Sequence, residues 1–150
     1  MMLELRKTNS DNTDFKSLVK QLDDFLKITD GDDHAFYNQY NGLQNINNVI
    51  IAYKDNTAIG CGTFKKFSKN TVEIKRMFTT EAARGQGVAS QILQALEQWA
   101  KTSGFTFSIL ETGIRQIEAI NLYKKCNYQI TENYGQYQGV SESLCFKKEL

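Results

Sequence analysis

The chain has 150 residues, of which 41% are hydrophobic and 23% charged, so it is long enough for one folded core and too short for several domains. Eighteen lysines and arginines against seventeen aspartates and glutamates give a formal net charge of +1 at pH 7. This balance excludes the strongly basic surface with which proteins hold nucleic acids or anionic membranes. We therefore expect a single domain over residues 1–150 with no nucleic-acid or membrane partner.

The first half of the chain alternates predicted strands and helices. Residues 3–7 alternate apolar and charged side chains, which is typical of a half-buried strand, and apolar residues then recur at helical spacing from Phe15 to Leu26. The pattern then predicts a short helix over residues 34–41 and a hairpin whose strands are residues 49–53 and 57–64. A third strand is predicted after a turn, over residues 71–79.

The second half begins with the most regular helix of the sequence. Its apolar stripe runs from Val88 to Trp99, and Gly104 marks its end. The sequence then predicts a buried strand over residues 105–110 and a short helix over residues 117–125. Two closing strands are predicted over residues 128–131 and 143–147. The order βααβββαβαββ predicts an α/β fold with a mixed, mostly antiparallel central sheet flanked by helices and one parallel crossover connection.

The cysteines and the single histidine indicate the compartment and the absence of a metal. Cys61, Cys126 and Cys145 include no CxxC pair, and His34 lies far from them in the sequence, so the usual spacing of zinc ligands is missing. No basic segment leads into an apolar one as in a secretory signal, and we expect a cytoplasmic protein with reduced thiols. Residues 30–33 lack the spaced oxygen ligands of a calcium loop and are expected to form a solvent-exposed connection.

A glycine-rich turn lies at the start of the predicted long helix. The first N–H groups of a helix have no helical partner and the helix dipole is positive at this end, so a pyrophosphate group would fit there. Gly85 and Gly87 allow the backbone to approach such a ligand, and Arg84 adds a positive charge. A tight turn that binds nothing explains the glycines equally well. The residues expected at the anion site are Arg84, Gly85, Gln86, Gly87, Val88, Ala89 and Ser90.

The turn fits neither of two common nucleotide-binding motifs. A Walker A loop ends in Gly-Lys-Ser or Gly-Lys-Thr after a fixed spacing, which this segment lacks. A Rossmann motif has a third glycine where Ser90 stands, and it follows a strand that is buried on both faces. The strand predicted here carries Glu73, Lys75 and Arg76. Both classes of nucleotide-binding protein are therefore excluded.

Two segments together resemble the GNAT superfamily of N-acetyltransferases. The acetyl-coenzyme A motif of that family reads Arg/Gln-x-x-Gly-x-Gly/Ala after a strand and at the start of a long helix, and Arg84-Gly85-Gln86-Gly87-Val88-Ala89 fits it. A later family helix resembles Ala119-Ile120-Asn121-Leu122-Tyr123-Lys124-Lys125, which an aromatic strand follows. Asn127 stands where the family commonly has glycine, and asparagine tolerates the left-handed backbone. The resemblance extends from about Ile59 to the end of the sequence and implies the GNAT fold.

The resemblance implies direct transfer of an acetyl group from acetyl-coenzyme A to a primary amine of a small molecule or peptide. Glu73, on a strand face that we expect it to share with Lys75 and Met77, is predicted to be the base that deprotonates the amine. An ion pair of Glu73 with Lys75 or Arg76 on a solvent-exposed strand face explains the residue equally well. Glu111 or a water molecule is the alternative base.

The resemblance also assigns contacts to the coenzyme. Tyr123 matches the family tyrosine near the coenzyme sulfur and is predicted to protonate the leaving thiolate, although a packing role is the alternative. Asn121 is expected to hydrogen-bond the pantetheine arm. The backbone of Met77, Phe78 and Thr79 is expected to pair with the pantetheine amides and to polarise the thioester carbonyl.

Several questions stay open at the level of sequence. A non-catalytic acyl-coenzyme A binding or sensor module would keep the same turn. Residues 134–137 contain two tyrosines and would either rim the acceptor pocket or form an aromatic hairpin tip, and His34 would either lie over the acceptor or pack against its neighbours. Residues 11–48 do not indicate which amine is the acceptor. Members of the family often dimerise, so a homodimer is a further open point.

Overall fold

The computed structural model describes residues 3–31 and 46–150. The helix predicted over residues 34–41, and His34 with it, lies outside the described residues. The described elements, in chain order, are β1 (Glu4–Thr8), α1 (Thr13–Asp30), β2 (Asn48–Lys54), β3 (Thr57–Ser68), β4 (Thr71–Thr79), the 3-10 helix Glu81–Ala83, α3 (Val88–Thr102), β5 (Phe107–Gly113), α4 (Ile117–Lys125), β6 (Gln129–Thr131), the 3-10 helix Gly135–Tyr137 and β7 (Ser143–Glu149).

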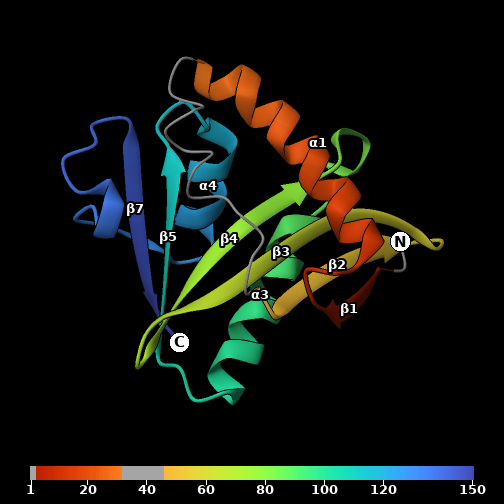
Figure 1. Cartoon of the computed structure of the whole chain (residues 1–150), viewed down its shortest axis with the longest axis horizontal. Helices are drawn as coiled ribbons and strands as arrows, with labels where there is room; N and C mark the ends of the chain where they lie inside the picture. Colours follow the sequence, from red (N-terminus) through yellow and green to blue (C-terminus); the bar gives the residue numbers. More distant parts are fainter. Residues whose placement is uncertain (1–2, 32–45) are drawn as a thin grey trace.

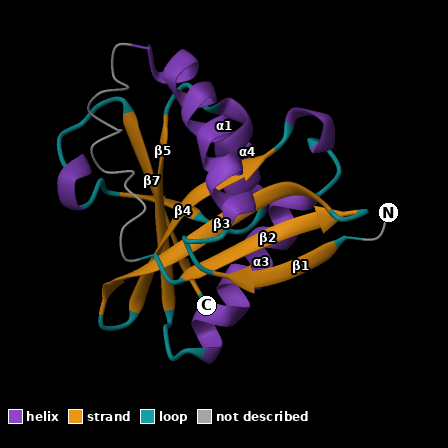
Figure 2. Ribbon diagram, turned by 45° about the vertical axis from the view of Figure 1, so that its right-hand side comes forward, coloured by secondary structure: helices purple, strands orange, loops and turns teal. Residues whose placement is uncertain are grey.

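The strands form one mixed sheet in the order β1-β2-β3-β4-β5-β7-β6 (Figure 1). Every neighbouring pair is antiparallel except β4 and β5, which run parallel and are connected through α3. Helix α1 lies across one face of β2, β3 and β4, and α3 lies behind the sheet on the other face (Figures 1 and 2). The predicted α/β class and its parallel crossover are confirmed.

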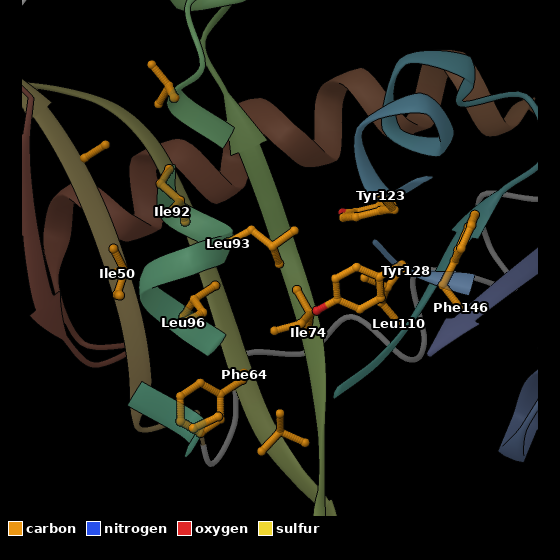
Figure 3. Packing of buried hydrophobic residues seen from close by; sticks show 14 of the residues in the cluster. Ile50, Phe64, Ile74, Ile92, Leu93, Leu96, Leu110, Tyr123, Tyr128 and Phe146 are labelled. Atoms are coloured by element: carbon orange, nitrogen blue, oxygen red, sulfur yellow. The ribbon is translucent and has the colours of Figure 1, made fainter. Parts of the chain in front are cut away.

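The sheet is buried on both faces, which explains the most apolar stretch of the sequence. In β2, Ile50 packs on the α3 side with Ile92, whereas the next residue, Ile51, packs on the α1 side with Phe15. Figure 3 shows the α3 side, where the side chains of the helix point at the strands. A strand that is covered on both faces is apolar throughout, and residues 49–53 have this composition.

The two long helices begin differently. The side-chain oxygen of Asn12 caps α1 by accepting a hydrogen bond of 3.0 Å from the N–H of Phe15. Helix α3 has no side-chain cap and follows directly on Gly87, which has a left-handed backbone with φ of 80°. The start of α3 therefore keeps its N–H groups available for another partner. Over the described ranges, no helix combines the length and apolar character needed to cross a membrane.

A bulge in β4 corrects one prediction. The register between β3 and β4 shifts between Cys61 and Thr63, and Arg76 adopts a positive φ of 60° on the facing strand. The extra residue reverses the alternation of side chains along β4. Glu73 faces the α1 side, whereas Met77 packs against the core on the α3 side. The expectation that Glu73 and Met77 share a strand face is therefore wrong.

Candidate active site

The candidate site lies where β4 and β5 separate. The two strands pair over only three residues, Thr71–Glu73 with Phe107–Ile109, although β4 continues to Thr79 and β5 to Gly113. In Figure 1 the two arrows start close together and diverge upward, with α4 beside the gap. Beyond Glu73, the edge of β4 that faces the gap has no neighbouring strand in the described sheet. Its backbone groups on that side are open to a ligand.

A large groove runs from this gap to the start of α3. Its volume is about 670 Å³, and the end of β4, the glycine-rich turn, α3 and α4 line it. The groove brings together all but one of the residues predicted to bind the coenzyme. Those that line it are Met77, Phe78, Thr79, Arg84, Gly85, Gly87, Val88, Ala89, Ser90 and Asn121. Gln86 is the exception, because its exposed side chain donates a hydrogen bond of 3.3 Å to the carbonyl oxygen of Ala82.

The glycine-rich turn presents open backbone to the groove. Gly85 and Gly87 have φ of 77° and 80°, and a Cβ atom built at either residue would have no other atom within 4 Å. In the first helical hydrogen bond of α3, the N–H of Gln91 donates to the carbonyl oxygen of Gly87 at 3.2 Å. The N–H groups that precede it lie at the positive end of the helix dipole. This arrangement suits an anionic group.

Arg84 adds a full positive charge beside the turn. Its Nε donates a hydrogen bond of 3.0 Å to the carbonyl oxygen of Thr79, and its guanidinium carbon lies 5.1 Å from the centre of the Phe25 ring in α1. These contacts hold the side chain along the wall of the groove. Phe25 also lines the groove, a position for which the sequence contained no signal beyond helical spacing.

A smaller cavity of about 110 Å³ adjoins the groove and is lined by residues of α1, β4, β5 and α4. The two spaces meet at the residues that line both of them, which are Leu22, Met77, Gln116, Ala119 and Tyr123. The charged residues that line the smaller cavity are Asp30, Glu73, Lys75, Arg76 and Glu111. Asp30 is only 6% exposed, so the expectation that residues 30–33 are solvent-exposed is wrong for this residue.

Glu73 is buried in this cavity, with 4% of its surface exposed. The hydroxyl of Tyr134 donates a hydrogen bond of 2.7 Å to Glu73 Oε2, and Lys65 Nζ lies 3.9 Å from Oε1. The ring of Tyr134 packs edge to face on that of Tyr137, with 5.7 Å between their centres. Of the two possibilities for residues 134–137, the segment lies against the buried carboxylate and does not project as a hairpin tip.

Glu111 supplies a second carboxyl group to the cavity. Ser143 Oγ donates a hydrogen bond of 2.7 Å to Glu111 Oε2. Burial raises the pKa of Glu111 to about 7, and the charges of Asp30 and Glu73 act in the same direction. The hydrogen bond from Ser143 and the charge of Lys75 oppose this shift. A carboxyl group with a pKa near neutrality is suited to accept a proton in catalysis.

Two cations lie among these acids. Arg76 Nη2 donates a hydrogen bond of 2.6 Å to Asp23 Oδ1 of α1, and the Arg76 side chain is only 2% exposed. Burial lowers the pKa of Lys75, while the charges of Glu73 and Glu111 raise it. The cavity is therefore a cluster of interacting charges with little access to water.

Tyr123 of α4 lies where the groove meets the cavity. Its ring packs against Tyr128 and Phe146, with 5.9 Å between the ring centres in each case (Figure 3). Burial raises the pKa of Tyr123 above its ordinary value, so the hydroxyl keeps its proton at neutral pH. A phenol at this junction can serve as a proton donor to a group that reacts there.

Two residues were missed by sequence reasoning, namely Asp30, which lines the cavity, and Ser143, which hydrogen-bonds one of its carboxyl groups. Asp30 was taken for part of a loop, because a run of aspartates is typical of solvent-exposed segments. Ser143 resembled any other residue at the start of a strand. Its contact with Glu111 arises because β7 pairs with β5 so that Ser143 lies opposite Gly113. Only the order of the strands reveals this neighbourhood.

Known proteins resemble the chain in sequence. The profile of the Acetyltransferase (GNAT) family matches residues 15–128. The IAA acetyltransferase of Azospirillum brasilense is 31% identical over 102 residues, which are 67% of each chain. A Xenopus tropicalis protein assigned as N-acetyltransferase 14 is 32% identical over 104 residues, which are 67% of this chain and 49% of that protein. The match thus spans about two thirds of the first of these proteins and half of the second.

Solved structures resemble it over almost its whole length. A Klebsiella pneumoniae protein assigned to the acyl-CoA N-acyltransferases superposes with a TM-score of 0.84 and 26% identity, covering 99% of this chain and 98% of the other. A GNAT family acetyltransferase from Elizabethkingia anophelis, crystallised with acetyl-CoA bound, has a TM-score of 0.70 and 18% identity, with coverage of 99% and 98%. The family profile matches residues 15–128, and the groove lies where β4 and β5 diverge. The chain therefore belongs to the acetyltransferase (GNAT) family.

Proposed function

We propose that the protein is an N-acetyltransferase that transfers the acetyl group of acetyl-coenzyme A to a primary amine of a small molecule or peptide. The observation that carries the proposal is the junction between the groove and the acid-lined cavity at Met77 and Tyr123. A thioester in the groove would reach this junction from one side, and an amine in the cavity would face it from the other. The two substrates then react directly in one pocket.

The groove offers a suitable group for each part of the donor. The N–H groups of the turn and the charge of Arg84 would hold the diphosphate. The open edge of β4 would pair with the amide groups of the pantetheine arm as a further strand does, with Asn121 lining the groove as well. A backbone N–H near Phe78 would polarise the thioester carbonyl and stabilise the oxyanion that forms on attack.

The acceptor arrives as an ammonium ion with a pKa of about 10 and must lose a proton before it attacks. We propose that Glu111 accepts this proton, because the pKa of its carboxyl group is raised to about 7. We propose that Glu73 binds the ammonium group. The freed nitrogen attacks the carbonyl carbon and the carbon–sulfur bond breaks. As the amide forms, the nitrogen gives up its second proton, which replaces the proton that Tyr123 donates to the leaving thiolate, so that an amide and coenzyme A thiol result and the ammonium proton stays on Glu111. The assignment of Glu73 as the base, made from the sequence, stays a prediction that the variants of both residues test.

Tyr123 would donate its hydroxyl proton to the leaving thiolate. Its position at the junction supports this role. Burial raises the pKa of Tyr123, so the hydroxyl is protonated when the thiolate forms, although it is a weaker acid than an exposed tyrosine. A non-catalytic acyl-coenzyme A module would need the groove but neither buried carboxyl group, and the pair of acids therefore favours an enzyme. A cytoplasmic location belongs to the same proposal, and the three free cysteines support it.

Thermal unfolding tests donor binding. Acetyl-coenzyme A at one hundred times its Kd is expected to add about 2.7 kcal/mol to the unfolding free energy. For a chain of this size the midpoint would rise by roughly 5 to 10 °C. NADH at the same concentration is expected to have little effect, and a larger shift with NADH would contradict the assignment of the groove.

Release of coenzyme A thiol in the presence of amines tests transfer. The variant Tyr123→Phe is expected to lower kcat at least tenfold while donor binding persists. Tyr128→Phe is the matched control, because this neighbouring ring hydrogen-bonds Ser108 and does not line the groove. Unchanged turnover in Tyr123→Phe would reject its role. If acetyl-coenzyme A binds but no amine causes the release of coenzyme A thiol, the protein would instead be a non-catalytic acyl-coenzyme A binding module.

A further inference from the structure

The segment between β6 and β7 carries a hydrogen-bond donor for each of the two glutamates of the cavity. Tyr134, near the start of the segment, donates to Glu73, and Ser143, where β7 begins, donates to Glu111, each at 2.7 Å. The 3-10 helix Gly135–Tyr137 lies between the two donors. The place of one donor relative to the other therefore depends on how the two ends of the segment are joined.

The backbone pairing of β6 with β7 stops before it reaches these donors. Thr131 and Cys145 form the last pair, and the same register, if continued, would place Asn133 opposite Ser143. A side chain makes the link at this point. Asn133 Nδ2 donates hydrogen bonds of 3.1 Å to the carbonyl oxygen of Ser143 and of 3.0 Å to that of Val140. The amide therefore joins the two ends of the segment where the pairing of the strands has ended.

We infer that Asn133 is a positioning residue for the proposed acetyl transfer, because its side-chain amide holds Tyr134 and Ser143 in place against the two glutamates. The inference rests on the proposed function and adds to it a residue that lines neither the groove nor the cavity. Asn133 therefore acts through the two hydroxyl donors and not by contact with a substrate.

The hydrogen bonds of Asn133 form a closed ring that includes Ser143. The carbonyl oxygen of Val140 accepts one hydrogen bond from Asn133 Nδ2 and another, of 3.1 Å, from the N–H of Ser143. The amide nitrogen of asparagine carries two N–H donors, so it can serve the carbonyl oxygens of Val140 and Ser143 at the same time. Tyr134 is the next residue in the chain and has an extended backbone, so its position follows from that of Asn133.

Other contacts hold each end of the segment on the sheet separately. The ring of Tyr134 packs edge to face on Phe67 of β3, with 5.2 Å between the ring centres. At the other end, the carbonyl oxygen of Glu142 accepts a hydrogen bond of 2.9 Å from the N–H of Ile114. We expect these contacts to keep the segment folded without the amide of Asn133, while the two hydroxyl groups lose their fixed places. A displacement of about 1 Å at a reacting group is enough to lower the rate strongly.

The pKa of Glu111 reports whether Ser143 is in place. The hydrogen bond from Ser143 lowers this pKa against the larger effect of burial, and the charged groups that also act on it are Asp30 of α1 and Glu73 and Lys75 of β4. The other titratable groups beside Glu111 are Tyr123, Tyr137 and Cys145, which stay uncharged at neutral pH because burial raises their pKa values. A substitution of the amide leaves all of these groups in the protein, so a further rise in the pKa of Glu111 indicates the loss of its hydrogen-bond donor.

The pH dependence of thiol release tests the inference. In Asn133→Ala, kcat/KM for an amine that the native protein acetylates is expected to fall about fivefold or more at pH 7. The midpoint of its rise with pH is expected to move upward by about half a pH unit or more, because Glu111 loses the donor that lowers its pKa. A general loss of stability would leave this midpoint in place. Gln138→Ala is the control, since Gln138 is exposed in the same segment. An unchanged midpoint in Asn133→Ala would overturn the inference.

A variant that already lacks both donors tests the route of the effect. In Tyr134→Phe/Ser143→Ala, the further change Asn133→Ala is expected to lower kcat/KM by less than about twofold, because the groups through which Asn133 acts are absent. A full loss in this background would show that Asn133 acts in another way and would overturn the inference. If Asn133→Ala does not fold, Asn133→Ser takes its place, because serine keeps one donor. The midpoint is then expected to move in the same direction, and a fixed midpoint has the same adverse meaning.

A measurement without turnover separates this inference from the proposed function. If no amine releases thiol from acetyl-coenzyme A with the native protein, the proposed acetyl transfer fails. The carboxyl carbon of Glu111 is then titrated by nuclear magnetic resonance in the native protein and in Asn133→Ala. A higher midpoint in the variant supports the placing of Ser143 by Asn133, and equal midpoints overturn it. If the native protein is active, a higher midpoint with unchanged kcat/KM also overturns the inference.

Discussion

The hydroxyl of Tyr134 donates a hydrogen bond of 2.7 Å to Oε2 of Glu73, a residue 61 positions earlier in the chain. Ser143, at the start of β7, donates a bond of the same length to Glu111. The segment from β6 to β7 therefore orients both carboxyl groups of the cavity, although neither carboxyl group belongs to it. Because β7 pairs with β5 along its whole length, this orientation depends on the closure of the sheet.

The variant Tyr134→Phe is expected to leave Glu73 Oε2 buried without its donor. We expect the unfolding free energy to fall by about 1 to 3 kcal/mol and kcat/KM for amines to fall on the order of tenfold. Denaturant unfolding and steady-state kinetics measure the two effects. Tyr53→Phe is the control, because this buried hydroxyl donates a bond of 2.7 Å to Asp14, which does not line the site. Equal kinetic effects in both variants would contradict an orienting role.

Local patterns predicted most of the fold. The bounds of β4 and α4 agree with the sequence prediction, because alternation of side chains and helical spacing are clear there. Strand β3 continues to Ser68 rather than ending at residue 64, because its last four residues are exposed and lack the apolar alternation that marks a strand. The bulge at Arg76 was missed for a related reason, since a regular period of two does not allow for an extra residue.

The two parts of the site differed in how well the sequence predicted them. The turn at the start of α3 is contiguous, so its glycines and its arginine revealed it. The acid-lined cavity combines Asp30 from α1, Glu73 from β4 and Glu111 from β5. Such a cluster depends on the order of strands in the sheet and on where they separate, and neither feature is encoded in a short motif.

The pH dependence of Glu111→Gln provides a test of the proton acceptor. In the native protein kcat/KM is expected to rise as the pH increases through about 7, where Glu111 ionises. In Glu111→Gln this rise is expected to disappear, and kcat/KM above pH 7 is expected to be at least tenfold lower than in the native protein. Glu73→Gln is expected to keep the rise and to have a higher KM for the amine. A rise near pH 7 that disappears in Glu73→Gln instead would identify Glu73 as the base.

The same carboxyl group is expected to affect stability. Because its pKa is raised from the ordinary value of 4.5 to about 7, the folded state retains a proton that the unfolded state has lost between these pH values. The stability of the native protein therefore decreases as the pH rises through this window. Relative to the native protein, Glu111→Gln is expected to gain on the order of 2 to 3 kcal/mol between pH 4.5 and 8. Denaturant unfolding at several pH values measures the gain, and a constant difference would contradict the raised pKa.

A negative charge at the start of α3 is expected to have opposite effects on stability and donor binding. Ser90→Asp places an acid in a first helical turn that has none, which stabilises the free protein by about 0.3 to 1 kcal/mol. The same carboxylate lines the groove and repels the diphosphate, so Kd for acetyl-coenzyme A is expected to rise at least tenfold. Gln91→Asp is the control, since Gln91 is exposed and does not line the groove. Unchanged donor affinity in Ser90→Asp would show that the diphosphate binds elsewhere.

Gly62 tests how tightly α3 packs on the bulged strand pair. A Cβ atom at this position would lie 2.9 Å from Ile92 Cγ2 and from Leu96 Cδ1, and it would also contact Met77 Sδ. Gly62→Ala is therefore expected to cost about 1 to 3 kcal/mol of unfolding free energy. In the double variant Gly62→Ala/Met77→Ala, the space left by the methionine relieves the overlap. The loss of unfolding free energy in the double variant is therefore expected to be at least about 1 kcal/mol smaller than the sum of the losses in the two single variants. A strictly additive result in denaturant unfolding would mean that Met77 does not fill the space opposite Gly62, and that the side chain at the junction of groove and cavity lies elsewhere.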